Sequence, residues 1–162
     1  MKKTNMIKIR TSKRADTRSA EGEITKAGLL ADTKAHIGDV QKGCVFMADM
    51  LKESGKKHDY TKLEYFDEFY RDIQTREQGD KFKRLAWYQK HLQERHHLLD
   101  KVPDDVNLVD VMEMIVDCCM AGMARSGSVY DIAIDSETLQ LAVQNTKALL
   151  SKNIVVDDES VW

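Results

Sequence analysis

Apolar residues in the first third of the chain recur at steps of three and four positions. Between Thr25 and Ser54 they form one stripe, which consists of Ile37, Val40, Cys44, Met47 and Leu51. This spacing gathers side chains on one face of an α-helix. The pattern therefore predicts a helix over residues 25–54 whose stripe faces a core, and Ser54-Gly55 supplies its end.

Two helices are predicted in the middle of the chain. The first begins at Thr61, where Glu64 three residues later completes a capping box, and its apolar stripe consists of Leu63, Phe66, Tyr70 and Ile73. The second covers about residues 81–97 and has Trp87 on its buried side. The hydrophobic period thus predicts two helices joined by a turn.

A fourth helix follows Pro103, with helical spacing of apolar residues from 108 to 119. Its other flank is lined by carboxylates, because Asp110, Glu113 and Asp117 stand three and four residues apart. We expect Asp110 to face solvent. The remaining two carboxylates lie one turn apart on the same face.

Helical spacing also dominates the end of the chain. A fifth helix is predicted over residues 136–152, with a cap at Asp135 or Ser136. Only Ile7–Arg10 and Ile154–Val156 have the pattern of extended segments, and both are short. The chain is therefore predicted to be all-α, with about five helices.

Length and composition predict one compact domain. A chain of 162 residues can bury its own core, and we place the helical domain at 23–152, after a short basic N-terminal arm over 1–22 and before a C-terminal tail over 153–162.

The formal net charge of -2 argues against a stable nucleic-acid complex. No apolar run is long enough for a membrane span. Three cysteines without a disulfide pattern favour the cytoplasm.

The candidate chemistry lies in the histidines, all five of which fall between positions 36 and 97. In order, the residues are His36, His58 with Asp59, His91, the adjacent pair His96 and His97, and then Asp117 on the fourth helix. Imidazole nitrogens and carboxylate oxygens suit divalent iron, manganese or zinc, and no thiolate belongs to the set. The residue types predict a metal centre.

This order of residues resembles the HD-domain superfamily, whose members are all-helical metal-dependent phosphohydrolases named after a His-Asp pair. The resemblance covers about residues 25–125. It implies that the ligands common to the superfamily are His36, His58, Asp59 and Asp117. It also implies an HD-like helical fold around them.

The later histidines extend the resemblance. His91 with His96 or His97 matches the extra ligands of members that hold two or three metals, and the whole order is that of the cyclic-dinucleotide phosphodiesterases. The segment from Trp87 to the histidine pair is also similar to small bacterial and phage-encoded proteins of this kind. Five helical steps turn His96 away from the face of His91, so the helix must end or bend near Glu94 for both to bind.

Lys62, three residues after Asp59, is the second candidate catalytic residue beside that carboxylate. The matching lysine touches phosphate in the cyclic-dinucleotide phosphodiesterases and also occurs in di-iron oxygenases that resemble myo-inositol oxygenase. In both branches an ammonium group neutralises charge on the metal-bound ligand. An exposed lysine at a helix start is the other interpretation of this position.

Four more residues are candidates for substrate contacts or for support of the ligands. Adjacent side chains point apart, so we expect His96 to bind metal and His97 to reach substrate or to cap. Glu113 can orient a ligand histidine by accepting a hydrogen bond from the ring nitrogen that does not bind metal, or it can be a solvated carboxylate. Arg14 and Arg18 of the basic arm can grip a phosphate, or they remain a solvated tail.

The resemblance implies a phosphohydrolase that acts on a nucleotide, a cyclic (di)nucleotide or another phosphoester. It would use one or two divalent ions, manganese or iron ahead of zinc, magnesium, nickel or cobalt. The first alternative is an HD-fold di-iron oxygenase, and the second is a non-catalytic nucleotide-binding protein. The expected partner is a small phosphorylated substrate, and a homo-oligomer is left open.

Overall fold

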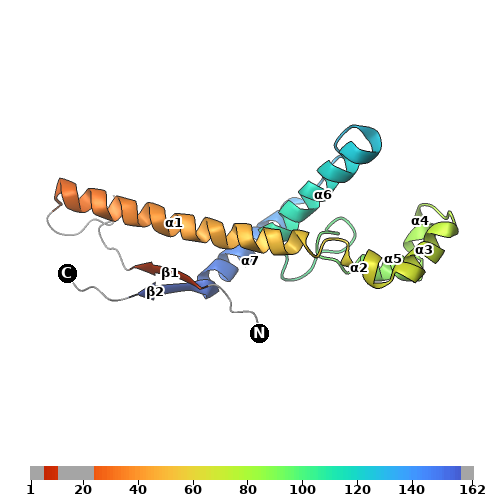
Figure 1. The fold of residues 1–162 in the computed structure, drawn as a ribbon, viewed down its shortest axis with the longest axis horizontal. Coiled ribbons are helices and arrows are strands. Elements are labelled where there is room, and N and C mark those ends of the chain that lie inside the picture. Colours follow the sequence, from red (N-terminus) through yellow and green to blue (C-terminus); the bar gives the residue numbers. More distant parts are fainter. Residues whose placement is uncertain (1–5, 11–23, 158–162) are drawn as a thin grey trace. The chain divides into compact units, whose positions relative to one another are not determined.

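The computed structural model describes residues 6–10 and 24–157, and Figure 1 shows that they are mostly helical. The prediction of an all-α fold class is confirmed. The chain divides into two compact units, Met1–Asp49 with Lys147–Trp162, and Met50–Thr146. Each unit is described by itself. Among the described residues, no helix combines the length and apolar character that crossing a bilayer requires.

The first unit contains most of helix α1 (Lys26–Gly55) and the only two strands among the described residues, β1 (Ile7–Arg10) and β2 (Ile154–Asp157). The strands pair in parallel, with Ile7 opposite Ile154, and lie side by side in Figure 1. Both extended segments were predicted from the sequence. Their pairing was not, because strand register across the chain leaves no local signal.

Helix α1 confirms the prediction of a helix over 25–54 but not the burial of its stripe. No residue of α1 is buried, and Ile37 and Val40 are each 51% exposed. Periodicity fixes which side chains share a face of a helix. Burial also needs a packed neighbour, which periodicity alone does not supply.

The second unit begins with four short helices that cluster together in Figure 1. They are α2 (Tyr60–Glu64), α3 (Phe66–Gln74), α4 (Asp80–Lys83) and α5 (Ala86–His91). The two helices predicted in this region are therefore each split. The breaks occur where the backbone leaves the helical region, at Tyr65 (φ -114°, ψ 41°) and at Leu85 (φ -65°, ψ 143°).

Two details of the helix predicted to begin at Thr61 are wrong. Thr61 is not a cap: the helix starts one residue earlier, Asp59 stands at its N-cap, and the Thr61 side chain is buried. The predicted apolar stripe faces solvent, with Leu63 79% and Phe66 54% exposed. Thr61 is buried because its hydroxyl binds side chains 30 and 33 residues further along the chain.

The unit continues with α6 (Leu108–Ser126) and the first part of α7 (Ser136–Asn153). Its buried core is formed by Leu98, Val106, Val111, Met114 and Ala142. Asn107 caps α6 in a capping box with Asp110. The core thus fixes α6, the helix that carries two carboxylates of the candidate site.

The expectation that Asp110 faces solvent is wrong, because this residue is only 3% exposed. Arg95 holds it in a fork: Nε donates to Oδ1 and Nη2 to Oδ2, both at 2.7 Å. Arg95 Nη1 also donates to Asp105 at 2.9 Å. The fork ties the segment after α5 to the start of α6.

Candidate metal centre

The His-Asp pair lies in the link between α1 and α2. Asp59 adopts the left-handed conformation (φ 57°, ψ 23°), which aspartate tolerates better than most residues. An N-cap aspartate ordinarily accepts a hydrogen bond from the first turn of its helix, but this side chain makes none. Its carboxylate instead lies 3.7 Å from His58 Nε2 and 3.5 Å from His91 Nε2.

The other histidines come from the end of α5 and the turns that follow. His91 is the last residue of α5, and backbone hydrogen bonds from Glu94 to His91 and from His97 to Glu94 close two turns after it. The helix break expected near Glu94 therefore occurs, three residues earlier. Outside a helix, the adjacent His96 and His97 can reach one centre together.

Helix α6 supplies the last carboxylates. Asp117 Oδ1 lies 3.4 Å from His58 Nε2, and Glu113 Oε1 lies 3.0 Å from His58 Nδ1. The two carboxylates thus approach opposite nitrogens of one imidazole. Glu113 also accepts a hydrogen bond from the hydroxyl of Ser54, at the end of α1.

Three sets of side chains have ligand atoms close enough together to hold one metal ion, all within 4.8 Å of one another. We call them the His58 group (His58, His96, Asp117), the His91 group (Asp59, His91, His97) and the Glu94 group (Asp59, Glu94, His96). The last two share Asp59, and the first and last share His96. The whole cluster lies within the second unit.

The Nδ1 atoms of three histidines face carboxylates or a hydroxyl. Glu113 Oε1 is 3.0 Å from Nδ1 of His58 and 3.3 Å from Nδ1 of His96. Thr61 Oγ1 is 2.8 Å from Nδ1 of His91. Ligand histidines in metalloproteins commonly donate their second N–H in this way, which leaves Nε2 unprotonated for the metal.

The opposite nitrogens provide the test of whether a cation fits. His96 Nε2 is buried without any hydrogen-bond partner, 3.9 Å from Asp59 Oδ1. The Nε2 atoms of His91 and His97 face each other at 2.9 Å. A buried polar atom without a partner is costly, and a divalent ion would satisfy these nitrogens and the Asp59 carboxylate at once. The residues present therefore fit a metal ion.

Two carboxylates of the cluster, Glu94 and Glu113, are held in the ionised form. Burial would raise the pKa of Glu94, but hydrogen bonds from His91 and Thr61 outweigh it and hold this pKa at about 2. Burial likewise opposes the hydrogen bonds from two histidines and Ser54 to Glu113, whose pKa falls below its usual range. Both side chains are therefore acceptors at neutral pH.

His58 and His97 titrate in opposite directions. Hydrogen bonds with Asp117 and Glu113 raise the pKa of His58 to about 10, from an ordinary 6.5. Burial lowers the pKa of His97 to about 4, and the neighbouring imidazoles lower it further. His58 thus favours the protonated imidazole, and His97 favours the neutral one.

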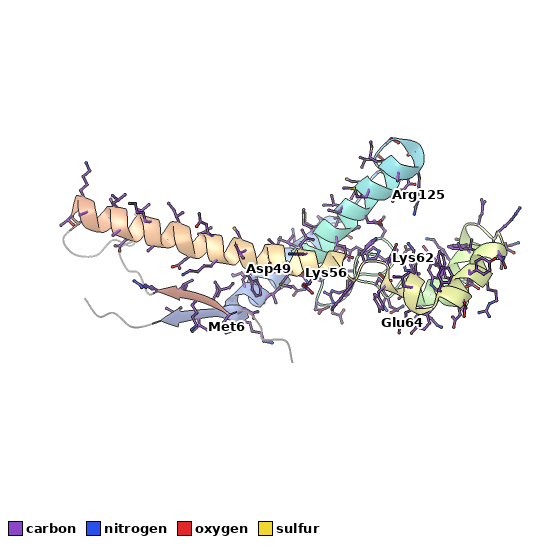
Figure 2. All side chains as sticks on the ribbon, in the orientation of Figure 1. Met6, Asp49, Lys56, Lys62, Glu64 and Arg125 are labelled. Carbon is purple, nitrogen blue, oxygen red and sulfur yellow. The ribbon has the colours of Figure 1, made fainter. Side chains whose placement is uncertain are left out.

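Lys62 also lies at the cluster. It comes from α2 (Figure 2), one helical turn after Asp59, and its ammonium donates to Asp59 Oδ2. Its side chain is 29% exposed, and that of Asp59 is 27% exposed. Solvent therefore reaches the cluster at the Lys62–Asp59 pair.

Three further predicted site residues, His36, Arg14 and Arg18, are not tested by the structure. His36 is exposed on α1 and belongs to none of the metal-capable groups found among the described residues. It stays a sequence prediction only. Arg14 and Arg18 lie outside the described residues.

Two buried residues of the cluster were missed by the sequence reasoning, Glu94 and Thr61. Glu94 stands three residues after His91 and two before His96, a spacing that could have drawn attention to it. Thr61 carried a misleading signal, because threonine followed by Glu64 three residues later is also the pattern of a capping box.

A scan against protein-family models found no matching family, and searches of curated proteins and of solved structures found no match.

Proposed function

We propose that this protein is a metal-dependent phosphohydrolase of the HD-domain type. Its one or two divalent ions would be held by His58, Asp59, His91, His96, His97 and Asp117. The observation that carries the proposal is the convergence of these side chains from three separate segments on one cluster, with Asp59 facing the Nε2 atoms of three histidines. The observed donor set is nitrogen and oxygen only, which suits manganese or iron.

A shared carboxylate supports a pair of ions rather than a single one. Asp59 Oδ2 lies on the side of His58, and its Oδ1 lies on the side of His91. Each oxygen can therefore serve a different position, and pairs of ions are common in enzymes that cleave phosphoesters. Bound divalent ions would lower the pKa of a coordinated water and polarise the phosphoryl oxygens.

The residues of the chain supply orientation and charge. Glu113 holds His58 and His96 by their Nδ1 atoms, so both imidazoles keep their orientation. The ammonium of Lys62 stands at the solvent-accessible edge of the cluster, where a substrate phosphate can meet it. Such a fixed cation stabilises negative charge that develops in the transition state. The expected substrate is a nucleotide, a cyclic (di)nucleotide or another phosphoester.

Metal analysis followed by a substrate screen tests the proposal. The purified chain is stripped with chelator, reloaded with Mn²⁺, and assayed for phosphate or nucleotide release from mono-, di- and cyclic phosphoesters. The matched variants are Asp59→Asn and Asp67→Asn, since Asp67 is an exposed aspartate at the start of α3. We expect activity in the wild type and in Asp67→Asn but none in Asp59→Asn.

Three outcomes would exclude or redirect the proposal. Wild-type protein that binds no divalent ion would exclude it. Iron that remains bound through purification, together with oxygen consumption and no phosphoester cleavage, would favour the di-iron oxygenase. Tight nucleotide binding without turnover would favour the non-catalytic alternative.

A further inference from the structure

Thr61 occupies an unexpected place for a residue at the start of a helix. It is 2% exposed, and its hydroxyl lies between two side chains of the segment that carries His91. Thr61 Oγ1 is 2.8 Å from His91 Nδ1 and also contacts Glu94 Oε1. A buried hydroxyl placed between an imidazole and a carboxylate can donate to only one of them.

The direction of these hydrogen bonds follows from the carboxylate. Glu94 Oε1 accepts the backbone N–H of Thr61 at 2.9 Å, and an ionised carboxylate can only accept. The Thr61 hydroxyl must therefore donate to Glu94. Its oxygen, 2.8 Å from His91 Nδ1, is left to accept a hydrogen bond from the Nδ1–H, which also lies 3.3 Å from Glu94 Oε1, and the Nε2 of His91 keeps its lone pair.

The His91 ring is also fixed from its face. Trp87 stacks on it with ring centroids 4.9 Å apart and an interplanar angle of 17°. The indole Nε1 of the same Trp87 donates to the backbone carbonyl of Thr61 at 3.4 Å. Thr61 therefore contacts both the edge of the His91 ring and the residue stacked on that ring.

We propose that Thr61 is a positioning residue of the metal centre. Its hydroxyl, oriented by Glu94, accepts a hydrogen bond from the Nδ1–H of His91. This hydrogen bond directs the Nε2 lone pair of His91 toward Asp59. The proposal rests on the proposed metal centre but assigns a new role, because sequence reasoning treated Thr61 as a helix cap. Thr61 touches no reacting group and acts through His91.

The test compares Thr61→Val, which removes the hydroxyl at nearly constant shape, with Thr61→Ser, which keeps it. Thr138→Val is the matched control, since Thr138 is also buried and its hydroxyl donates to Asp135. Mn²⁺ affinity is measured by calorimetry. The ¹⁵N shifts of the His91 ring in chelator-treated protein report which nitrogen carries the proton, with His91→Gln as the assignment variant.

We expect Thr61→Val to weaken Mn²⁺ binding by about 10-fold to 100-fold, the usual effect of removing a partner of a ligand histidine. It should also move part of the His91 population to the Nε2–H tautomer. Thr61→Ser should restore both properties, and Thr138→Val should change neither. Unchanged affinity and unchanged ring shifts in Thr61→Val would overturn the role of Thr61. Wild-type protein that binds no Mn²⁺ would instead refute the proposed function, because the ring shifts are measured without metal.

Discussion

The His58 and His91 groups present similar ligands but are held in different ways. In the His58 group, the side chains of His58 and Asp117 are 26% and 35% exposed, and only His96 is buried. In the His91 group, the His91 side chain is only 5% exposed and is packed against Trp87 and Thr61. Under the proposed function, the buried His91 ring would fix the geometry of the centre, and a substrate would approach the more exposed His58 and Asp117.

Asp59 faces the histidines of both groups, so its removal should have the largest effect. In Asp59→Ala we expect loss of Mn²⁺ binding and a fall in turnover of at least about 1,000-fold, because metal-activated water and charge stabilisation disappear together. Helical circular dichroism should persist, since Asp59 caps no helix with its side chain. Asp67→Ala is the control. Retention of activity in Asp59→Ala would remove the basis for a common centre.

Lys62 should affect turnover without affecting the metal. In Lys62→Met we expect kcat to fall by about 100-fold, in line with the loss of one preorganised charge at a reaction centre, while Mn²⁺ affinity changes little. The exposed Lys81 of α4 gives the control variant Lys81→Met. Parallel measurements of kcat and of Mn²⁺ affinity separate the two effects. Loss of metal in Lys62→Met would show that this lysine supports Asp59 rather than the substrate.

Substitution of Arg95 tests whether its hydrogen bonds to Asp110 position the segment that carries His96 and His97. Arg95→Lys keeps the charge but cannot form the two-pronged hydrogen bond to Asp110. We expect a loss of about 2 kcal/mol in the free energy of unfolding, because Asp110 is buried and loses charged hydrogen bonds. Mn²⁺ affinity should fall by about 10-fold as His96 and His97 loosen. Arg84→Lys, at an exposed position, should be neutral in urea denaturation and calorimetry.

The smallest effect concerns the pH dependence of stability in chelator-treated protein. The raised pKa of His58 contributes stability that is complete below pH 6.5 and is lost as pH rises toward 10. The lowered pKa of His97 acts in the opposite sense, since its contribution is complete above pH 6.5 and is lost as pH falls toward 4. Unfolding midpoints should therefore be highest near pH 6.5. His58→Asn should flatten the alkaline side and His97→Asn the acid side; identical profiles in both variants would contradict the assignment.

Long periodic segments were predictable from the sequence, and short segments were not. Helices α1 and α7 were expected within one or two residues, because their spacing repeats over many turns, and α6 starts at the expected residue but continues beyond position 119 to Ser126. The short helices α2 to α5 were not, because a four-residue to nine-residue helix holds too few repeats for its ends to be read. Their limits depend on contacts with distant residues.

In the candidate site, residues could be predicted from their type and order, but contacts between residues distant in sequence could not. Residue chemistry and order pointed to six ligands. His58, Asp59, His91, His96 and Asp117 lie in the cluster, and the sixth, His36, belongs to none of the metal-capable groups among the described residues. Thr61 and Asp110 were misread because their partners, at positions 91 to 95, are distant in sequence. The sequence did not decide between His96 and His97, because adjacent side chains point apart in a helix. Both can reach the cluster here, since α5 ends at His91.

The central claim is that His58, Asp59, His91, His96 and Asp117 surround a divalent cation. Anomalous diffraction from a crystal soaked in Mn²⁺ tests it most directly. The account predicts anomalous peaks at coordinating distance from the Asp59 carboxylate and from the Nε2 atoms of His58, His91 and His96. Well-ordered side chains at these positions with no anomalous peak, at saturating Mn²⁺, would contradict it.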